Sequence, residues 1–232
     1  MLDRRQLVFD FPVSGSFARD HFLPSDCNRE AFETVLAWRH WQQPACLLVG
    51  PPGSGRSHLA RIFAAEAEAR VLGGAELWRL DDPLAELGAF RALAIDDADL
   101  CEEPRRLLEL YNLVVQRQGR ILLTAQAAPA EWPVELPDLR SRLKAALQLR
   151  IAPPDDGLLA ALLVKQFRDR QLAVEPEVVH FLVGNMERTF EAARRLVAAL
   201  DRLSLVARRR VTMPLARIAL AELSAGERVV GE

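Results

Sequence analysis

Short apolar runs alternate with helical patterns along the first two thirds of the chain. Five runs have the length and aliphatic character of buried strands, and they cover Cys46–Val49, Glu76–Leu80, Ala92–Ile95, Arg120–Thr124 and Leu147–Ile151. The residues between them favour helices, among them Ser57–Ala69. This alternation is typical of a parallel sheet flanked by helices. The pattern therefore predicts an α/β fold.

The apolar spacing changes after Pro153 and Pro154. Neither proline can continue a helix interior, and Pro154 pushes its predecessor toward an extended conformation, so we place a domain boundary here. Beyond it, apolar residues recur at intervals of three and four, which predicts a small C-terminal helical lid over 153–222. The spacing is lost from Leu223 to Glu232, and a frayed tail is expected at 223–232.

Composition narrows the classes of protein and partner. The formal net charge of the 232 residues is -2, which gives no global basic footprint for nucleic acid. Three scattered cysteines fit cytosolic thiols better than a disulfide framework or a zinc site. The first residues do not resemble a signal peptide, and no apolar stretch has the ~18 residues of a membrane span. We expect a cytoplasmic protein without membrane contact.

A glycine-rich segment, GPPGSGRS, follows the first predicted strand and precedes a helix. Glycines in such a loop let successive backbone N–H groups turn toward phosphates, and the helix adds the positive end of its dipole. Ser57 would then hold Mg²⁺. The alternative is a strand-to-helix turn without a ligand. The nucleotide-binding residues predicted here are Gly50, Pro51, Pro52, Gly53, Ser54, Gly55, Arg56, Ser57 and His58.

Arg56 stands where the G-x-x-x-x-G-K-[ST] pattern has lysine. Lysine reaches the outer phosphates as a compact charge, whereas arginine is a longer, planar fork and is not equivalent. Binding of ADP or ATP with Mg²⁺ should therefore survive better than hydrolysis. We expect weak or no intrinsic ATPase activity.

Polar residues end two further predicted strands. In Leu93–Asp97, Asp96 would lie near the metal and Asp97 could orient the attacking water. An ordinary strand followed by an acidic turn is the alternative. The strand that begins at Ile121 ends in Thr124 and Gln126, at the edge where open α/β folds bind ligands.

Two further segments contain arginines whose role the sequence pattern does not decide. Arg140 and Arg142 lie in PDLRSRL, and Arg188 lies in NMERTFEA. Each arginine could be a solvated surface charge, and Arg188 could instead fold over the phosphates. Periodicity does not decide between these interpretations.

In their order, GPPGSGRS, AIDDAD, ILLTAQ, PDLRSRL and NMERTFEAARRLVAALD resemble the AAA+ core of the replication initiator DnaA. The resemblance implies that Thr124 and Gln126 lie at the sensor 1 position. It also implies that Arg142 is the arginine finger offered to a neighbouring subunit and that Arg188 is the sensor 2 arginine. DnaA continues into a helix-turn-helix domain that has no counterpart here, so no stable sequence-specific DNA binding is expected.

The arginine in the P-loop and the missing DNA-binding module make the chain similar to the Hda family, DnaA-related regulators that work with the polymerase sliding clamp. The sequence QLVFDF in the N-terminal tail, 1–12, resembles a clamp-binding peptide. Extended chain would direct alternate apolar side chains to pockets on a partner. The alternative is a first strand packed on the chain's own core. The predicted clamp-binding residues are Gln6, Leu7, Phe9 and Phe11.

The sequence and the resemblance suggest two functions of different classes. In the first, the AAA+ domain at 13–152 binds nucleotide, the tail binds the clamp, and Arg142 stimulates ATP hydrolysis by DnaA in trans. The second is an autonomous AAA+ ATPase that remodels a nucleoprotein, as a helicase loader does. A DNA-binding initiator fragment is disfavoured by the missing module. The expected partners are the sliding clamp and DnaA, and the resemblance also allows a homo-oligomer.

Overall fold

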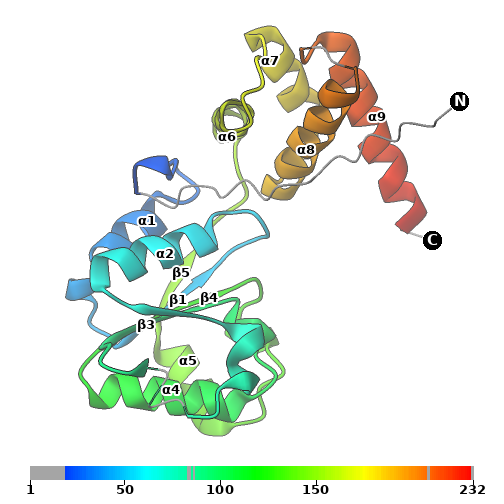
Figure 1. The fold of residues 1–232 in the computed structure, drawn as a ribbon. Coiled ribbons are helices and arrows are strands. Elements are labelled where there is room, and N and C mark those ends of the chain that lie inside the picture. The colour runs from blue at the N-terminus through cyan, green and yellow to red at the C-terminus, as the bar shows by residue number, and fades with distance from the viewer. Residues whose placement is uncertain (1–18, 83–84, 86, 208–209, 231–232) are drawn as a thin grey trace, which may run out of the picture.

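The computed structural model describes residues 19–82, 85, 87–207 and 210–230 and shows an α/β domain followed by a helical lid (Figure 1). Five parallel strands form one sheet in the order β2-β3-β4-β1-β5. They are β1 (Ala45–Val49), β2 (Arg70–Gly73), β3 (Ala92–Asp96), β4 (Arg120–Ala125) and β5 (Leu147–Arg150). The predicted fold class is confirmed.

Helices cover both faces of the sheet (Figure 1). On one face lie α1 (Arg29–Leu36) and α2 (Arg56–Ala67), and on the other lie α4 (Pro104–Gln116) and α5 (Pro137–Ala145). Each interface has its own apolar core. Because both faces are covered, β1 is buried at every position, which explains its continuous apolar sequence.

The strand order brings three loops to one edge of the sheet. β1 lies between β4 and β5, and β3 pairs with β4. All pairs are parallel, so the loops after Val49, Asp96 and Ala125 leave from the same carboxyl edge. Ligands of open α/β sheets bind at this edge.

The prediction of a strand at Glu76–Leu80 is wrong. The second strand is Arg70–Gly73, and Gly74–Arg79 forms 3-10 turns in which Leu77 is buried and Trp78 is 53% exposed. β2 is an edge strand without a fully buried residue, so its apolar signal is weak. Gly74 follows it because a Cβ there would come within 2.1 Å of the Asp97 carbonyl oxygen.

The lid consists of four helices with a separate apolar core. They are α6 (Asp156–Asp169), α7 (Pro176–Asn185), α8 (Phe190–Ala207) and α9 (Met213–Val230). Pro153 and Pro154 lie between β5 and α6, where the Asp155 carboxylate caps α6 by accepting from the Leu158 N–H at 2.6 Å. Within the described residues, no helix is long and apolar enough to cross a membrane.

The expected tail, which was to lose its regular structure from Leu223, begins later than expected. α9 continues to Val230, so the backbone stays helical after the apolar spacing is lost. Alanine, glutamate and arginine in this stretch are good helix formers, and a helix needs no apolar face to extend by another turn.

Candidate nucleotide site between the P-loop and the lid

The glycine-rich segment GPPGSGRS, residues 50–57, is the P-loop, and it joins β1 to α2 at the carboxyl edge of the sheet. Gly53 and Gly55 have φ angles of +76° and +95°, which favour glycine, and Gly55 directly precedes α2. The loop is closed by a hydrogen bond from the Ser54 N–H to the Pro51 carbonyl at 3.2 Å. This strand–loop–helix geometry is the one that presents backbone N–H groups to an anion.

The two glycines also allow close packing around the loop. A Cβ on Gly53 would lie 3.1 Å from Phe190 Cβ at the start of α8, and one on Gly55 would lie 3.0 Å from Phe22 Cε2. The P-loop therefore touches both the lid and the segment before α1.

Replacing Gly55 by alanine is expected to destabilise the fold by about 1–3 kcal/mol, because alanine is strained at a positive φ and its methyl group would press on Phe22. Thermal or urea unfolding measures the change. The matched control is Gly184→Ala in α7, where a Cβ meets no atom of the described residues within 4 Å. Equal losses in both variants would contradict the expected strain.

Arg56 is folded back into the protein. One terminal nitrogen of its guanidinium donates to the Gly50 carbonyl at 2.8 Å, and the other donates to Asp97 Oδ1 at 2.9 Å. Its side chain is only 10% exposed. The fork is thus engaged by the loop and by the end of β3, which is a different placement from that of a lysine extended toward outer phosphates.

The carboxylates of Asp96 and Asp97, at the end of β3, have different hydrogen-bond partners: Asp96 pairs with Thr124 and Asp97 with Arg56. The Thr124 hydroxyl donates to Asp96 Oδ1 at 2.6 Å and accepts from the Asp97 N–H at 2.9 Å, which ties β4 to the end of β3. Burial raises the pKa of the Asp97 carboxyl above its ordinary value; the charge of Arg56 opposes this shift, and the nearby Asp96 and Asp99 carboxylates add to it.

Asp99 was not singled out by the sequence reasoning. Its Oδ2 accepts from the N–H groups of Gln126 and Ala127 at 2.8 and 3.0 Å, so it fixes the loop after β4. Its other oxygen is buried without a hydrogen-bond partner among the described residues. The only available signal was its place in the acidic turn Asp96–Asp99.

A polar cavity of about 510 Å³ opens beside the P-loop. Predicted residues that follow three strands line it together: Pro52, Gly53, Arg56 and Ser57 after β1, Asp97 after β3 and Gln126 after β4. The remaining lining residues are Asp99, Leu100, Glu191 and Arg194, so the lid contributes a carboxylate and a guanidinium. Asp96 and Arg188 are not among the residues that line it.

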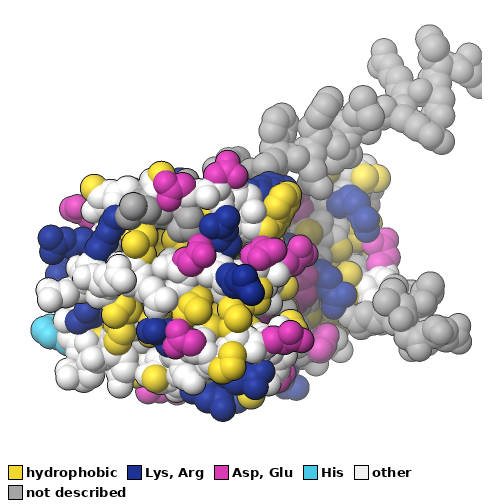
Figure 2. All heavy atoms as spheres, turned by 90° about the horizontal axis from the view of Figure 1, so that it is seen from below, with side chains coloured by type: hydrophobic (Ala, Val, Ile, Leu, Met, Phe, Trp, Pro, Cys, Tyr) yellow, Lys and Arg dark blue, Asp and Glu magenta, His cyan; other side chains and the backbone are white. Residues whose placement is uncertain are grey.

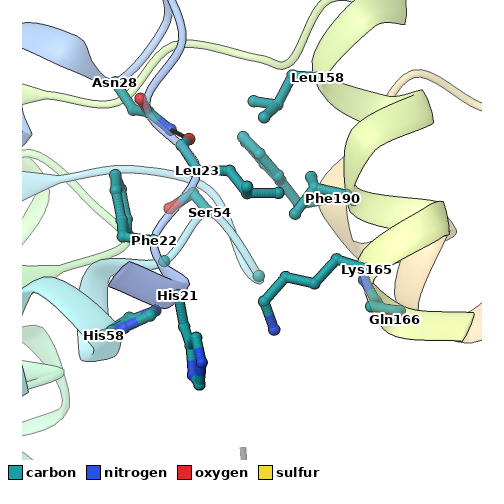
Figure 3. Close-up of a pocket in the computed structure, with 13 residues that line it drawn as sticks. His21, Phe22, Leu23, Asn28, Ser54, His58, Leu158, Lys165, Gln166 and Phe190 are labelled. Carbon is teal, nitrogen blue, oxygen red and sulfur yellow. Dashed lines mark hydrogen bonds between the residues drawn. The ribbon is translucent and has the colours of Figure 1, made fainter. Parts of the chain in front are cut away.

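A second, more apolar cavity of about 220 Å³ lies on the other side of Gly53 (Figure 3). Phe22, Leu158 and Phe190 converge on it from the segment before α1, from α6 and from α8. The predicted residues Ser54 and His58 also line it. Ser54 Oγ is buried without a hydrogen-bond partner among the described residues.

Two arginines near the start of α8, Arg188 and Arg194, lie differently relative to the P-loop. Arg188 Nε donates to Asp156 Oδ1 at 2.7 Å and its terminal nitrogen donates to Oδ2 at 3.1 Å, a pair that joins the turn before α8 to α6. Arg194 makes a similar double hydrogen bond with Glu191 on α8, at 3.0 and 2.7 Å, beside the polar cavity. The structure therefore brings Arg194, and not Arg188, to the P-loop.

Arg142 lies on α5, and it lines neither cavity beside the P-loop. It donates to both oxygens of Asp138 at 3.0 and 3.2 Å and lies over the Tyr111 ring, 5.3 Å from its centre. Figure 2 shows the underside of the α/β domain, where acidic and basic side chains are interspersed. Such a face suits a charged protein partner better than a nucleic-acid backbone.

The residues present fit a nucleotide. The glycine cradle and the polar cavity suit phosphates, and the apolar cavity suits a base. Mg²⁺ has hard oxygen donors in Ser57 and the acidic turn. Among the described residues, His, Cys, Asp and Glu form no group of three that could hold a metal ion, so a magnesium ion would also need phosphate oxygens.

Solved structures with a similar fold include domain III of DnaA from Thermotoga maritima, 19% identical with a TM-score of 0.76, covering 91% of this chain and 98% of that one. AMPPCP-bound DnaA from Aquifex aeolicus is 15% identical with a TM-score of 0.71, covering 94% and 71%. The RuvB Holliday junction branch migration motor of Thermotoga maritima is 19% identical with a TM-score of 0.68, covering 90% and 72%.

The strand order, the P-loop and the helical lid give the chain the fold of these AAA+ domains. Residues 155–220 match the family model described as "Hda, lid domain". The chain therefore combines a DnaA-like AAA+ fold with a lid that is similar to that of the Hda family.

Proposed function

We propose that this protein is a nucleotide-bound regulator of replication initiation that is tethered to the sliding clamp and stimulates ATP hydrolysis by DnaA in trans. Its general role as a DnaA-related replication regulator is supported by the Hda lid and the DnaA-like fold. The nucleotide is supported by the paired cavities beside Gly53 and by the AMPPCP-bound state of a similar DnaA structure.

The observation that carries the proposal is the position of Arg142. This guanidinium lies on α5 outside the chain's own nucleotide cavities, where its partner is the surface carboxylate of Asp138. An arginine in this place can serve a neighbouring active site, where it would stabilise charge on the transferred phosphoryl group.

The interior of the chain's own site favours binding over hydrolysis. The Arg56 guanidinium is held by the Gly50 carbonyl and by Asp97 Oδ1, so the cation of the P-loop is engaged by the protein itself. Asp97 as the group that orients water, and Asp96 with Ser57 as magnesium ligands, stay predictions. The nucleotide then acts mainly by joining the P-loop to the lid at Gly53 and Phe190.

Clamp tethering is proposed from the sequence alone. Gln6, Leu7, Phe9 and Phe11 lie outside the described residues, as does all of 1–12. Their alternating pattern matches a peptide that binds in extended form.

The isolated protein is expected to bind ADP or ATP with Mg²⁺ and to hydrolyse ATP very slowly. The glycine loop keeps its backbone donors, whereas the Arg56 guanidinium is engaged by the Gly50 carbonyl and by Asp97. Calorimetric titration measures binding, and phosphate release under multiple-turnover conditions measures hydrolysis. No detectable binding of either nucleotide would refute the nucleotide site. Brisk turnover without partners would support an autonomous remodelling ATPase instead.

A further inference from the structure

Arg142 lies at the boundary between α5 and α4, which pack against each other beneath the sheet (Figure 1). The neighbouring Leu139 and Leu143 on α5 are buried in the core that these helices form with the sheet. The Arg142 side chain is 33% exposed, so it runs between the core and the solvent. The packing of α5 therefore fixes the backbone of Arg142, and the contacts of its side chain decide where the guanidinium lies.

The ring beneath this guanidinium belongs to Tyr111 on α4, the only tyrosine of the chain. Tyr111 is 4% exposed and is part of the same core. Arg142 Cζ lies 5.3 Å from the centre of the ring, within the range in which the negative face of an aromatic ring attracts a cation. Because a closely packed core holds its side chains in fixed orientations, the ring is a rigid support for the guanidinium.

Asp138 holds the same guanidinium along one edge. Its carboxylate lies one turn earlier on α5 and accepts from Nε and from one terminal nitrogen of Arg142. These bonds use two of the five N–H donors, and no partner within the described part of the chain takes the other three. The guanidinium is thus held on one face by Tyr111 and along one edge by Asp138, and its remaining donors are open to a partner.

The three side chains also influence one another through their charges. Burial raises the pKa of the Tyr111 phenol above its ordinary value; the positive charge of Arg142 opposes this shift, and the Asp138 carboxylate adds to it. None of the three lines either cavity beside the P-loop. Tyr111, Asp138 and Arg142 therefore form a cluster of their own, apart from the chain's own nucleotide site.

An arginine held in this way meets a partner in one orientation. The side chain is long and flexible, and fixing it costs conformational entropy when a complex forms. Where a ring and a carboxylate have already fixed the guanidinium, its free donors lie in a productive geometry for a larger share of the time. Loss of the ring would therefore lower the rate of the assisted reaction more than the strength of the complex.

We propose that Tyr111 is a positioning residue for Arg142, whose guanidinium its buried ring supports so that the donors not taken by Asp138 face the nucleotide of the partner. This inference rests on the proposed action of Arg142 in trans and adds to it the residue that orients the guanidinium. The motif PDLRSRL does not contain Tyr111, which lies on another helix.

The contact between Tyr111 and Arg142 can be tested without a partner. In NMR spectra of the full chain with isotope-labelled tyrosine, the ring signals come from Tyr111 alone. Arg142→Ala should shift these signals, because it removes the charge over the ring. Arg106→Ala, which removes an arginine of the same 33% exposure from α4, should leave them in place. Unchanged tyrosine signals in Arg142→Ala would overturn the contact on which the inference depends.

The effect on the reaction is measured by single-turnover ATP hydrolysis by DnaA over a range of concentrations of this protein. Tyr111→Leu keeps an apolar side chain in the core but removes the ring, and it should lower the maximal stimulated rate by about 5- to 30-fold, the scale of a cation–π contact. The concentration for half-maximal stimulation should change by less than about twofold. Tyr111→Phe keeps the ring and should stay within about threefold of the parent chain.

Val114→Ala is the matched control for lost packing. Val114 is fully buried on the same helix, and its truncation removes volume from the core while the Tyr111 ring remains. This variant should melt earlier than the parent chain yet stimulate DnaA to the same maximal rate. An equal loss of stimulation in Val114→Ala and Tyr111→Leu would show that Tyr111 acts only through stability.

The outcomes separate this inference from the proposed function. If Arg142→Ala stimulates DnaA as well as the parent chain, the action of Arg142 in trans fails, and the inference fails with it. If Arg142→Ala loses stimulation but Tyr111→Leu does not, or if Tyr111→Phe loses as much as Tyr111→Leu, the ring does not position Arg142. A rise in the half-maximal concentration without a fall in the maximal rate would assign Tyr111 to complex formation instead.

Discussion

Replacing Arg142 by alanine should eliminate the stimulation of ATP hydrolysis by DnaA, with a loss on the order of 10³-fold or more if this residue acts as an arginine finger supplied in trans. The chain's own nucleotide affinity and clamp binding should stay nearly unchanged, because Arg142 lines neither of its cavities. The assay is single-turnover phosphate release from ATP-loaded DnaA, with clamp-loaded DNA and either form of this protein.

The matched control is Arg106→Ala on the neighbouring helix α4. Both arginines have side chains 33% exposed and pair with a carboxylate on their own helix, Arg106 with Glu109 at 3.1 Å and Arg142 with Asp138 at 3.0 Å. Losing either surface pair should cost only about 0–1 kcal/mol of stability. If Arg142→Ala and Arg106→Ala both stimulate DnaA as well as the parent chain, the arginine-finger mechanism is wrong.

Changing Gln6, Leu7 and Phe9 together to alanine should abolish binding to the sliding clamp while folding and nucleotide binding persist. A docking peptide contributes its apolar side chains and the glutamine hydrogen bonds to the partner and little to its own core. Surface plasmon resonance on immobilised clamp measures the loss, and a melting curve measures stability. The control changes the preceding Arg4 and Arg5 to alanine.

The competing interpretation of this segment makes the opposite prediction. A first strand packed on the core would bury several side chains at ~1.5–3 kcal/mol each, so the triple variant would melt much earlier. A large fall in melting temperature with clamp binding preserved would therefore show that the segment belongs to the fold.

The class of fold could be predicted because strong local signals agree. Four of the five predicted strands match β1, β3, β4 and β5 closely. Of these, β1, β3 and β4 lie in the interior of the sheet, where strands buried on both faces are continuously apolar. The edge strand β2 was misplaced because its exposed residues carry little apolar signal. The position of the P-loop followed directly from its glycines.

The arrangement of charged side chains in the site could not be predicted. Sequence spacing marked Arg56 as an altered P-loop residue, but only the packing of β3 against β4 shows that Asp97 reaches it. Likewise, Asp99 became part of the site through its hydrogen bonds to the loop after β4.

The sequence by itself determined the AAA+ architecture, the phosphate-binding loop and the lid, because each depends on local periodicity, on glycine geometry or on a linear motif. Only the tertiary structure decided which of two arginines, Arg188 or Arg194, lines the polar cavity beside the P-loop. Arg188 and Arg194 both lie near the start of one helix, and each has a carboxylate within reach. The choice between them depends on how Phe190 packs on Gly53, a contact between residues 137 positions apart that no local pattern encodes.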